Sequence, residues 1–129
     1  MISSKASIHK KAKIGKNVII GDFCIIGENV EIGDDCNLIN SVNVQGYTKI
    51  GKKNKFFPFC SIGTLPQDLK FKGEKSYLEI GDNNSFREYS NISLGTEHGG
   101  LITKIQNNNL FMVGSHIGHD CQLGNNLVI

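Results

Sequence analysis

The sequence predicts an all-β protein, and more narrowly a parallel β-helix built from stacked six-residue turns. Large apolar residues recur with a period of six, and Ile outnumbers Leu by 17 to 9 among the 129 residues. β-Branched side chains favour strands over helices. The chain also holds 15 Gly and 14 Asn, which tolerate the left-handed backbone of tight corners. These features argue against a helical bundle.

The six-residue period is continuous through the first half of the chain. It places large apolar residues at Ile2, Ile8, Ile14, Ile20, Ile26, Ile32, Leu38, Val44, Ile50, Phe56 and Ile62. The same phase resumes at Ile80, Phe86 and Ile92, and it returns one position later at Ile105, Phe111, Ile117, Leu123 and Ile129. Because alternate side chains of a strand point to opposite faces, we expect all of these residues to point inward. Three hexads close one triangular coil, and the chain has room for roughly six coils.

Two further positions of the hexad hold small residues. The position after the large residue is often Gly, which we expect to permit tight bends without strain at a Cβ atom. The position four after the large residue is small or short, and all four cysteines occupy it: Cys24, Cys36, Cys60 and Cys121. Their spacing matches no CxxC metal pattern. We therefore expect buried, unpaired thiols that pack as small hydrophobic residues.

Charge and hydropathy exclude several classes of function. The net charge of +2 is too mild to predict binding to nucleic acid. No apolar run approaches the roughly 20 residues that a membrane span needs, and residues 1–16 contain no apolar segment typical of a secretory signal. We therefore expect a cytoplasmic protein. Its lysines cluster at residues 10–16, 49–55 and 70–75, either as a solvated face that guards strand edges or as a docking patch for an acidic partner.

The first interruption of the repeat, at about residues 64–79, predicts a loop that leaves the coil. Its sequence, TLPQDLKFKGEKSYLE, contains Pro66 and Gly73, as expected of a loop. The segment replaces more than two hexads and preserves the apolar phase, because Ile62 and Ile80 are 18 residues, one coil's length, apart. It can therefore be an excursion from one edge of the solenoid. Loops on a rigid repeat are common functional sites.

The second interruption, at about residues 94–104, reads LGTEHGGLITK and is rich in Gly. We expect His98, within it, to be an exposed loop residue.

A polar segment, GSHIGHDC at residues 114–121, lies within unbroken hexads. Ile117 is an inward position, so His116 points outward, and His119 lies near the strand end and also faces outward. Asp120 follows directly. Such imidazoles are ordinary on a bare surface, but at a subunit interface they would form a site. His and Asp are zinc ligand types, yet the rings of a His-x-x-His pair lie on different parts of the coil, so we expect no metal.

Three segments resemble the family of UDP-N-acetylglucosamine O-acyltransferases, which start lipid A synthesis. They are SIGTLPQDLKFKGE at residues 61–74, GGLITK at residues 99–104 and HIGHDC at residues 116–121. The resemblance spans the whole chain and lies within the hexapeptide-repeat proteins, so it implies a left-handed coil, an exception to the usual crossover rule. Family chains continue through more coils and a C-terminal helical domain. We therefore expect residues 1–129 to be one incomplete β-helix domain.

The resemblance implies an activity without a cofactor. A homotrimer would transfer an (R)-3-hydroxyacyl group from acyl carrier protein, an acidic partner suited to the lysine clusters, to the 3-hydroxyl of UDP-N-acetylglucosamine. His119 would be the general base, and Asp120 the acid that orients it, as in serine hydrolase triads. The other residues that the resemblance places at the substrate are His116, Asp68, Lys70 and Gln67.

Departures from the family leave alternatives open. Ser93 and Leu94 stand where the family commonly has a polar, basic pair, and the N–H expected to stabilise the oxyanion would lie beyond Ile129. One alternative is a metal-dependent β-helix lyase of the carbonic anhydrase type, which stoichiometric zinc lost on mutation of His116 would favour. The other is a non-catalytic β-helix module or an inactive fragment.

Overall fold

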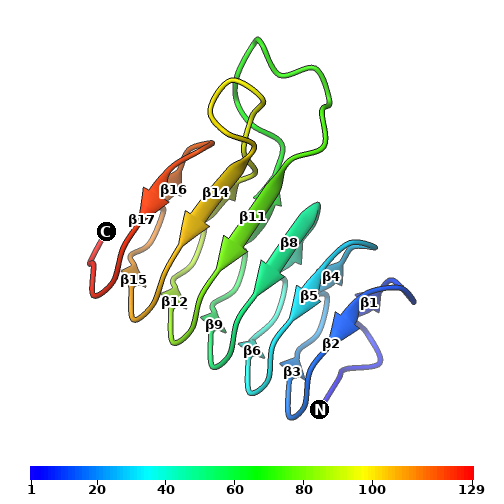
Figure 1. The fold of residues 1–129 in the computed structure, drawn as a ribbon. Coiled ribbons are helices and arrows are strands. Elements are labelled where there is room, and N and C mark those ends of the chain that lie inside the picture. Colours follow the sequence, from blue (N-terminus) through cyan, green and yellow to red (C-terminus); the bar gives the residue numbers. More distant parts are fainter.

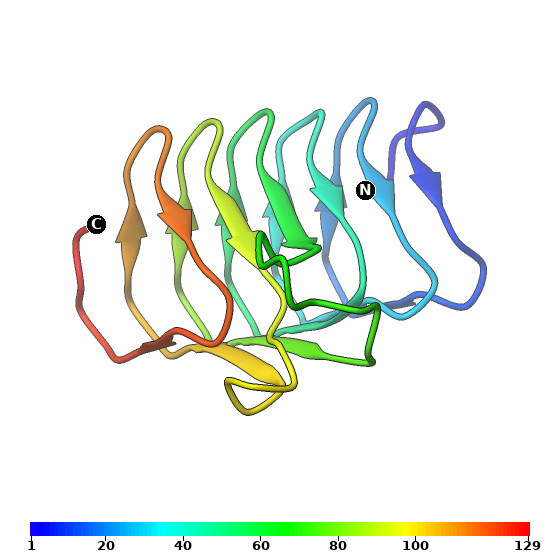
Figure 2. The same cartoon turned by 90° about the horizontal axis from the view of Figure 1, so that it is seen from above.

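The protein is a three-sided prism of stacked coils, described by a computed structural model for residues 1–129. The chain forms 17 strands of two to four residues and no helix, which confirms the all-β prediction. All strand pairs are parallel and join one coil to the next. Figures 1 and 2 show the coils in sequence order, with the two termini at opposite ends of the prism.

Each side of the prism is one parallel sheet. The first face consists of β1 (Ser7–Ile8), β4 (Ile25–Ile26), β7 (Asn43–Val44), β10 (Ser61–Thr64), β13 (Asn91–Ser93) and β16 (His116–Ile117). The second face consists of β2 (Lys13–Ile14), β5 (Glu31–Ile32), β8 (Tyr47–Ile50), β11 (Tyr77–Ile80), β14 (Ile102–Ile105) and β17 (Gln122–Leu123). The third face consists of β3 (Ile19–Ile20), β6 (Asn37–Leu38), β9 (Lys55–Phe56), β12 (Ser85–Phe86) and β15 (Leu110–Phe111).

The inward residues of the hexads stack in columns, as the period predicts. Within the prism, Phe56, Phe86 and Phe111 are fully buried, and their rings are stacked with centroids 4.7 and 4.6 Å apart. This spacing follows from the separation of paired strands, about 4.8 Å, because each ring is carried by the strand next to its neighbour's. The column therefore ties three successive coils together.

The first excursion leaves the prism at one edge, but its residues are inserted between two faces and do not replace hexads of the stack. Ile80 pairs with Ile50 on the second face, and Ile62 pairs with Ile92 on the first face. The chain thus advances by a single face between Ile62 and Ile80, and the loop does not replace a full coil. The inserted residues project from the corner between β10 and β11, so they add a protrusion without changing the stacking.

Most hexad glycines serve close approach between coils, which differs from their expected role at bends; a Cβ atom on Gly118 or Gly124, in the last coil, would have no neighbour closer than 3.9 Å. Apart from Gly63, the hexad glycines keep the backbone angle φ out of the positive range. A Cβ atom on Gly21 would lie 1.7 Å from the carbonyl oxygen of Ile39 in the next coil. The positive-φ corners are instead taken by non-glycine residues, including Asn17 and Asn83 as expected, and also the aromatic Phe23, Phe59 and Tyr89.

The cysteines are all free thiols. Cys24, Cys36 and Cys60 are buried as predicted, and burial raises the pKa of Cys60 to about 11. Cys121 is only partly buried, because it lies in the final coil and no further strand covers it. No helix in the structure has the length and apolar character required to cross a membrane.

Candidate active site at the corner between the first and second faces

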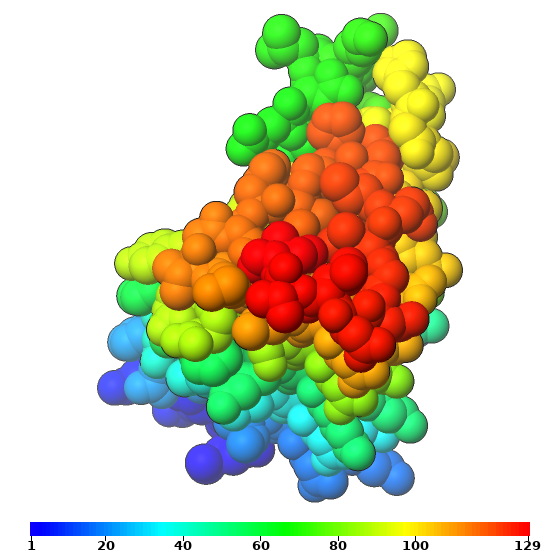
Figure 3. Space-filling view, turned by 90° about the vertical axis from the view of Figure 1, so that its left-hand side faces the viewer, coloured from blue at the N-terminus to red at the C-terminus, as the bar shows by residue number.

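The candidate residues gather at one corner of the prism, where strands of the first face turn into strands of the second. Loop 65–76 joins β10 to β11, and loop 94–101 joins β13 to β14. His119 and Asp120 lie in the short turn from β16 to β17, one coil further on. Figures 1 and 3 show the two loops (green and yellow) rising side by side next to this last coil.

His119 has one ring nitrogen held by the protein and one directed toward the loop. Its Nδ1 lies 2.9 Å from Oδ2 of Asp120, and its Nε2 lies 4.0 Å from Oδ2 of Asp68. The His119 side chain is 35% exposed. With Asp120 ionised, Nδ1 keeps its proton and its N–H donates a hydrogen bond to the carboxylate. Nε2 is then left as a proton acceptor that a ligand can reach.

Asp68 is positioned by the first turn of its own loop. Its Oδ1 accepts the main-chain N–H of Lys70 at 3.0 Å, and its carbonyl accepts the N–H of Phe71 at 2.9 Å. This is an Asx-type turn, in which a short carboxylate organises the following backbone. Asp68 is thereby brought over His119 from a segment far away in the sequence.

Asp120 is anchored from two sides. Oδ1 accepts the N–H of Thr96 at 2.6 Å, Oδ2 accepts the Thr96 hydroxyl, and the main-chain N–H of Asp120 donates to Oγ1 of Thr103 at 2.9 Å. Burial alone would raise the pKa of Asp120, but the hydrogen bonds from Thr96 and the contact with His119 outweigh it and lower the pKa below its ordinary value. Asp120 therefore stays a carboxylate beside the imidazole.

The two loops are joined by Glu74. Its carboxylate accepts the main-chain N–H of Glu97 at 3.0 Å and that of Lys72 at 2.7 Å. These two hydrogen bonds lower the pKa of Glu74. The loop that carries Asp68 is thus connected to the loop that carries Thr96.

The structure does not bring every predicted residue to the imidazole. His116 is exposed on β16, as predicted, and its Nδ1 lies 2.9 Å from Oδ1 of Asn91 in the coil before it. Lys70 and Gln67 are exposed on loop 65–76, and their side chains form no hydrogen bond or ion pair within the chain. His98 is exposed on its loop, as predicted.

Several residues at this corner were not anticipated as site residues. They are Thr96, Thr103, Glu74 and Asn91. Thr103 lies in GGLITK and Glu74 in SIGTLPQDLKFKGE, two of the segments that carry the family resemblance. Thr96 occupies a small-residue position of the hexad, and the hexad pattern alone does not indicate that its hydroxyl has a polar partner. Within residues 1–129 no three His, Cys, Asp or Glu side chains group as metal ligands.

Known proteins resemble this chain in sequence over most of its length. A model of the bacterial transferase hexapeptide (six repeats) matches residues 11–46. The chain is 50% identical over 121 residues to the acyl-[acyl-carrier-protein]–UDP-N-acetylglucosamine O-acyltransferase of Rickettsia typhi, covering 94% of this chain and 46% of the relative. It is 53% identical over 121 residues to the enzyme of the same name from Akkermansia muciniphila, with the same coverage. The chain thus spans about half the length of the curated relatives it matches.

Solved structures agree with the sequence comparison. LpxA from Acinetobacter baumannii superposes with a TM-score of 0.97 at 46% identity, over 98% of this chain and 49% of that one. LpxA from Bacteroides fragilis, a UDP-N-acetylglucosamine acyltransferase, gives a TM-score of 0.97 at 48% identity, over 100% of this chain and 50% of that one. The fold is therefore the left-handed parallel β-helix of hexapeptide repeats that the resemblance implied.

Proposed function

Because this chain belongs to the hexapeptide-repeat family of UDP-N-acetylglucosamine O-acyltransferases, we propose that the protein to which it belongs acylates UDP-N-acetylglucosamine in lipid A synthesis. The acyl donor is an (R)-3-hydroxyacyl acyl carrier protein, and the protein acts in the cytoplasm. The observation that carries the proposal is the His119–Asp120 pair, with Nδ1 of the imidazole on the carboxylate and Nε2 open toward Asp68.

The geometry suits activation of a sugar hydroxyl. An alcohol is a weak nucleophile near neutral pH, and a neutral imidazole can accept its proton. Nε2 of His119 removes the proton of the 3-hydroxyl, and the oxygen attacks the thioester carbonyl. The C–O bond forms and the C–S bond breaks, and the imidazolium returns the proton to the thiolate of the carrier. Asp120 stabilises the imidazolium during this cycle.

The loop residues supply substrate contacts in this proposal. Asp68 lies beside Nε2 of His119, where it can accept a hydrogen bond from a hydroxyl of the sugar. His116, Lys70 and Gln67 present exposed side chains around the same corner. Lys70, Lys72 and Lys75 also give loop 65–76 a positive charge that suits an acidic carrier protein.

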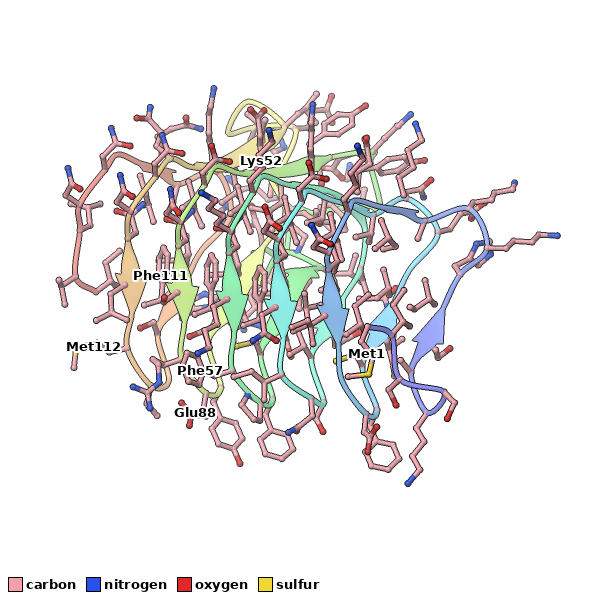
Figure 4. All side chains as sticks on the ribbon, turned by 90° about the horizontal axis from the view of Figure 1, so that it is seen from below. Met1, Lys52, Phe57, Glu88, Phe111 and Met112 are labelled. Atoms are coloured by element: carbon pink, nitrogen blue, oxygen red, sulfur yellow. The ribbon has the colours of Figure 1, made fainter.

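A homotrimer is supported by an apolar edge on the opposite side of the first face. Exposed apolar residues line the corner between the third and first faces: Ile19, Phe23, Ile25, Phe59, Tyr89, Met112 and Val113. Figure 4 shows Phe57, Glu88 and Met112 along this edge, with Lys52 on the other side of the prism. An apolar surface of this extent on a monomer marks an interaction site.

The outer columns of the faces point to the same conclusion. On the second face the outward residues alternate in charge: Lys13, Glu31, Lys49, Glu79 and Lys104. On the first face the outward residues include no Lys, Arg, Asp or Glu. They are Ser7, Ile25, Asn43, Ser61, Asn91 and His116. Interface centres are depleted in charge. The first face is therefore the better candidate for contact with a neighbouring subunit, and such contact would cover the corner that holds His119.

The activity is tested in the complete protein, including any sequence beyond residue 129. Purified enzyme is given UDP-N-acetylglucosamine and an (R)-3-hydroxyacyl carrier protein, and the acylated sugar nucleotide is quantified. We expect His119→Ala to lose at least about a hundredfold in kcat, as expected of a general base. The matched control His9→Ala, at the far end of the stack, retains activity. Turnover of His119→Ala within a few fold of wild type would remove this residue as the base.

The assembly is tested separately by analytical ultracentrifugation. We expect a trimer for the complete protein, and dissociation when Phe59→Asp places a charge on the apolar edge. Lys53→Asp, at a positive-φ corner on another edge of the prism, is the matched control and should leave the trimer intact. A monomeric wild-type protein would contradict this part of the proposal.

A further inference from the structure

We propose that Thr96 is a positioning residue for the general base, because its hydroxyl and main-chain N–H fix the Asp120 carboxylate against His119. This inference rests on the proposed function, and it concerns a residue of loop 94–101 that does not itself reach the substrate. Thr96 belongs to a different coil from the His–Asp pair, so the base is oriented across two coils.

Thr96 holds both oxygens of the carboxylate. Its N–H donates to Oδ1 of Asp120 at 2.6 Å, and its hydroxyl donates to Oδ2. Oδ2 is also the atom that accepts Nδ1–H of His119 at 2.9 Å. Two contacts on two oxygens fix the plane of the carboxylate, and a fixed plane sets the direction from which Oδ2 meets the imidazole.

The direction of the hydroxyl proton follows from the rest of the loop. Oγ1 of Thr96 accepts the N–H of Gly99 at 3.2 Å, which leaves its proton for Asp120. The carbonyl of Thr96 accepts the N–H of Leu101 at 2.7 Å, so the main chain is closed into a turn. Thr96 is only 1% exposed, and solvent cannot take over the role of its hydroxyl.

The consequence for the base is the choice of tautomer and ring orientation. A carboxylate that is held in place keeps the proton on Nδ1 and leaves Nε2 as the acceptor that faces Asp68. A rotating carboxylate would release Nδ1 and allow the ring to turn. Misplacement of a reacting group by about 1 Å can cost on the order of a hundredfold in rate.

The experiment compares Thr96→Val, Thr96→Ala and Thr96→Ser in the complete enzyme. We expect kcat to fall about tenfold to a hundredfold in the Val and Ala variants, with KM for UDP-N-acetylglucosamine within twofold of wild type, and recovery of most activity in the Ser variant. Thr48→Val is the control for loss of a buried threonine hydroxyl, since Thr48 is also 1% exposed and donates to a main-chain carbonyl away from the site.

A second readout does not require turnover. We expect the carboxyl pKa of Asp120, followed by carbon-13 NMR of Asp-labelled protein, to rise in Thr96→Ala and to stay near the wild-type value in Thr96→Ser. If wild-type enzyme fails to acylate the sugar nucleotide, the proposed function is wrong, while this titration still tests the Thr96 contact.

Three results would overturn the inference. They are kcat of both Val and Ala variants within threefold of wild type, an equal loss in Thr48→Val, and an Asp120 titration that is the same in all variants. If Thr96→Val does not fold, the Ala and Ser variants carry the comparison, and equal activity in these two would also refute it.

Discussion

The main chain of loop 94–101 passes so close to Asp120 that residue 99 has no space for a side chain. A Cβ atom on Gly99 would lie 2.0 Å from Oδ2 of Asp120 and 2.1 Å from its Cγ, whereas ordinary contact begins at 3.4 Å. The substitution Gly99→Ala must therefore displace the Asp120 side chain or the loop by roughly 1.4 Å, the difference between these distances. Either movement separates the carboxylate from Thr96.

The magnitude follows from the hydrogen bonds that are lost. Asp120 accepts two bonds from Thr96 and one from His119. Hydrogen bonds to a charged group contribute about 1.5–3 kcal/mol each, so the loss of one or two predicts a decrease in unfolding free energy of about 1.5–6 kcal/mol. Because the carboxylate no longer aligns the imidazole, we expect kcat to fall on the order of a hundredfold.

The assay measures chemical denaturation and acyl transfer for Gly99→Ala beside Gly118→Ala. Gly118 is next to His119 in the sequence, but its added Cβ would have no neighbour closer than Nε2 of His116 at 3.9 Å. We expect this control to match wild type in stability and activity. The reasoning would be refuted by a Gly99→Ala enzyme that is as stable and as active as Gly118→Ala.

Further outcomes are expected elsewhere in the prism. Phe86→Ala should cost about 3–5 kcal/mol in denaturation experiments, and about 0.5–1.5 kcal/mol more than Phe111→Ala, because Phe86 stacks on two rings and Phe111 on one; equal losses would contradict the role of stacking. In folded protein at pH 8, a maleimide should label Cys121 well before Cys60, whose pKa is raised by burial to about 11; rapid labelling of Cys60 would contradict its burial. The folded-state pKa of Asp120 is lowered, so this group contributes stability above the ordinary carboxyl value of about 3.9, and that stability is lost as pH falls through the folded value. Melting temperatures of Asp120→Asn should therefore fall less steeply than those of wild type below about pH 4, and parallel curves would oppose this.

The fold could be predicted because the hexad period is a global constraint. Each inward position must stack on the same position of the next coil, so Phe56, Phe86 and Phe111 are spaced to meet. The period does not reveal how many residues leave the stack at a loop. The 18 residues from Ile62 to Ile80 have the length of one coil, whereas the chain advances by a single face between them. It also does not distinguish a glycine needed at a bend from one needed for close approach, as at Gly21.

The candidate site could be predicted only in part. The resemblance named His119, Asp120 and Asp68, and the structure brings these three together. Thr96 could not be found from the repeat, because its position in the hexad explains a small buried residue equally well with or without a polar partner. Its role depends on where Asp120 lies one coil later, and that contact exists only once the coils are stacked.

The corner between the first and second faces shows how a regular repeat can hold the proposed catalytic pair at a position with positive φ. In two earlier coils the positive-φ residues nearest this corner are glycines, Gly46 between β7 and β8 and Gly63 within β10. In the last coil the positive-φ residue of this corner is Asp120, three residues after the inward Ile117, with φ of 65°. A left-handed backbone is strained for most residues but is tolerated by Asp. Here the strain is offset by the hydrogen bonds of the Asp120 carboxylate. The short side chain of Asp120 accepts the N–H of Thr96, and the same turn directs His119 outward. The function proposed for this protein therefore depends on a corner position where glycine would be easier to accommodate but could not orient a base.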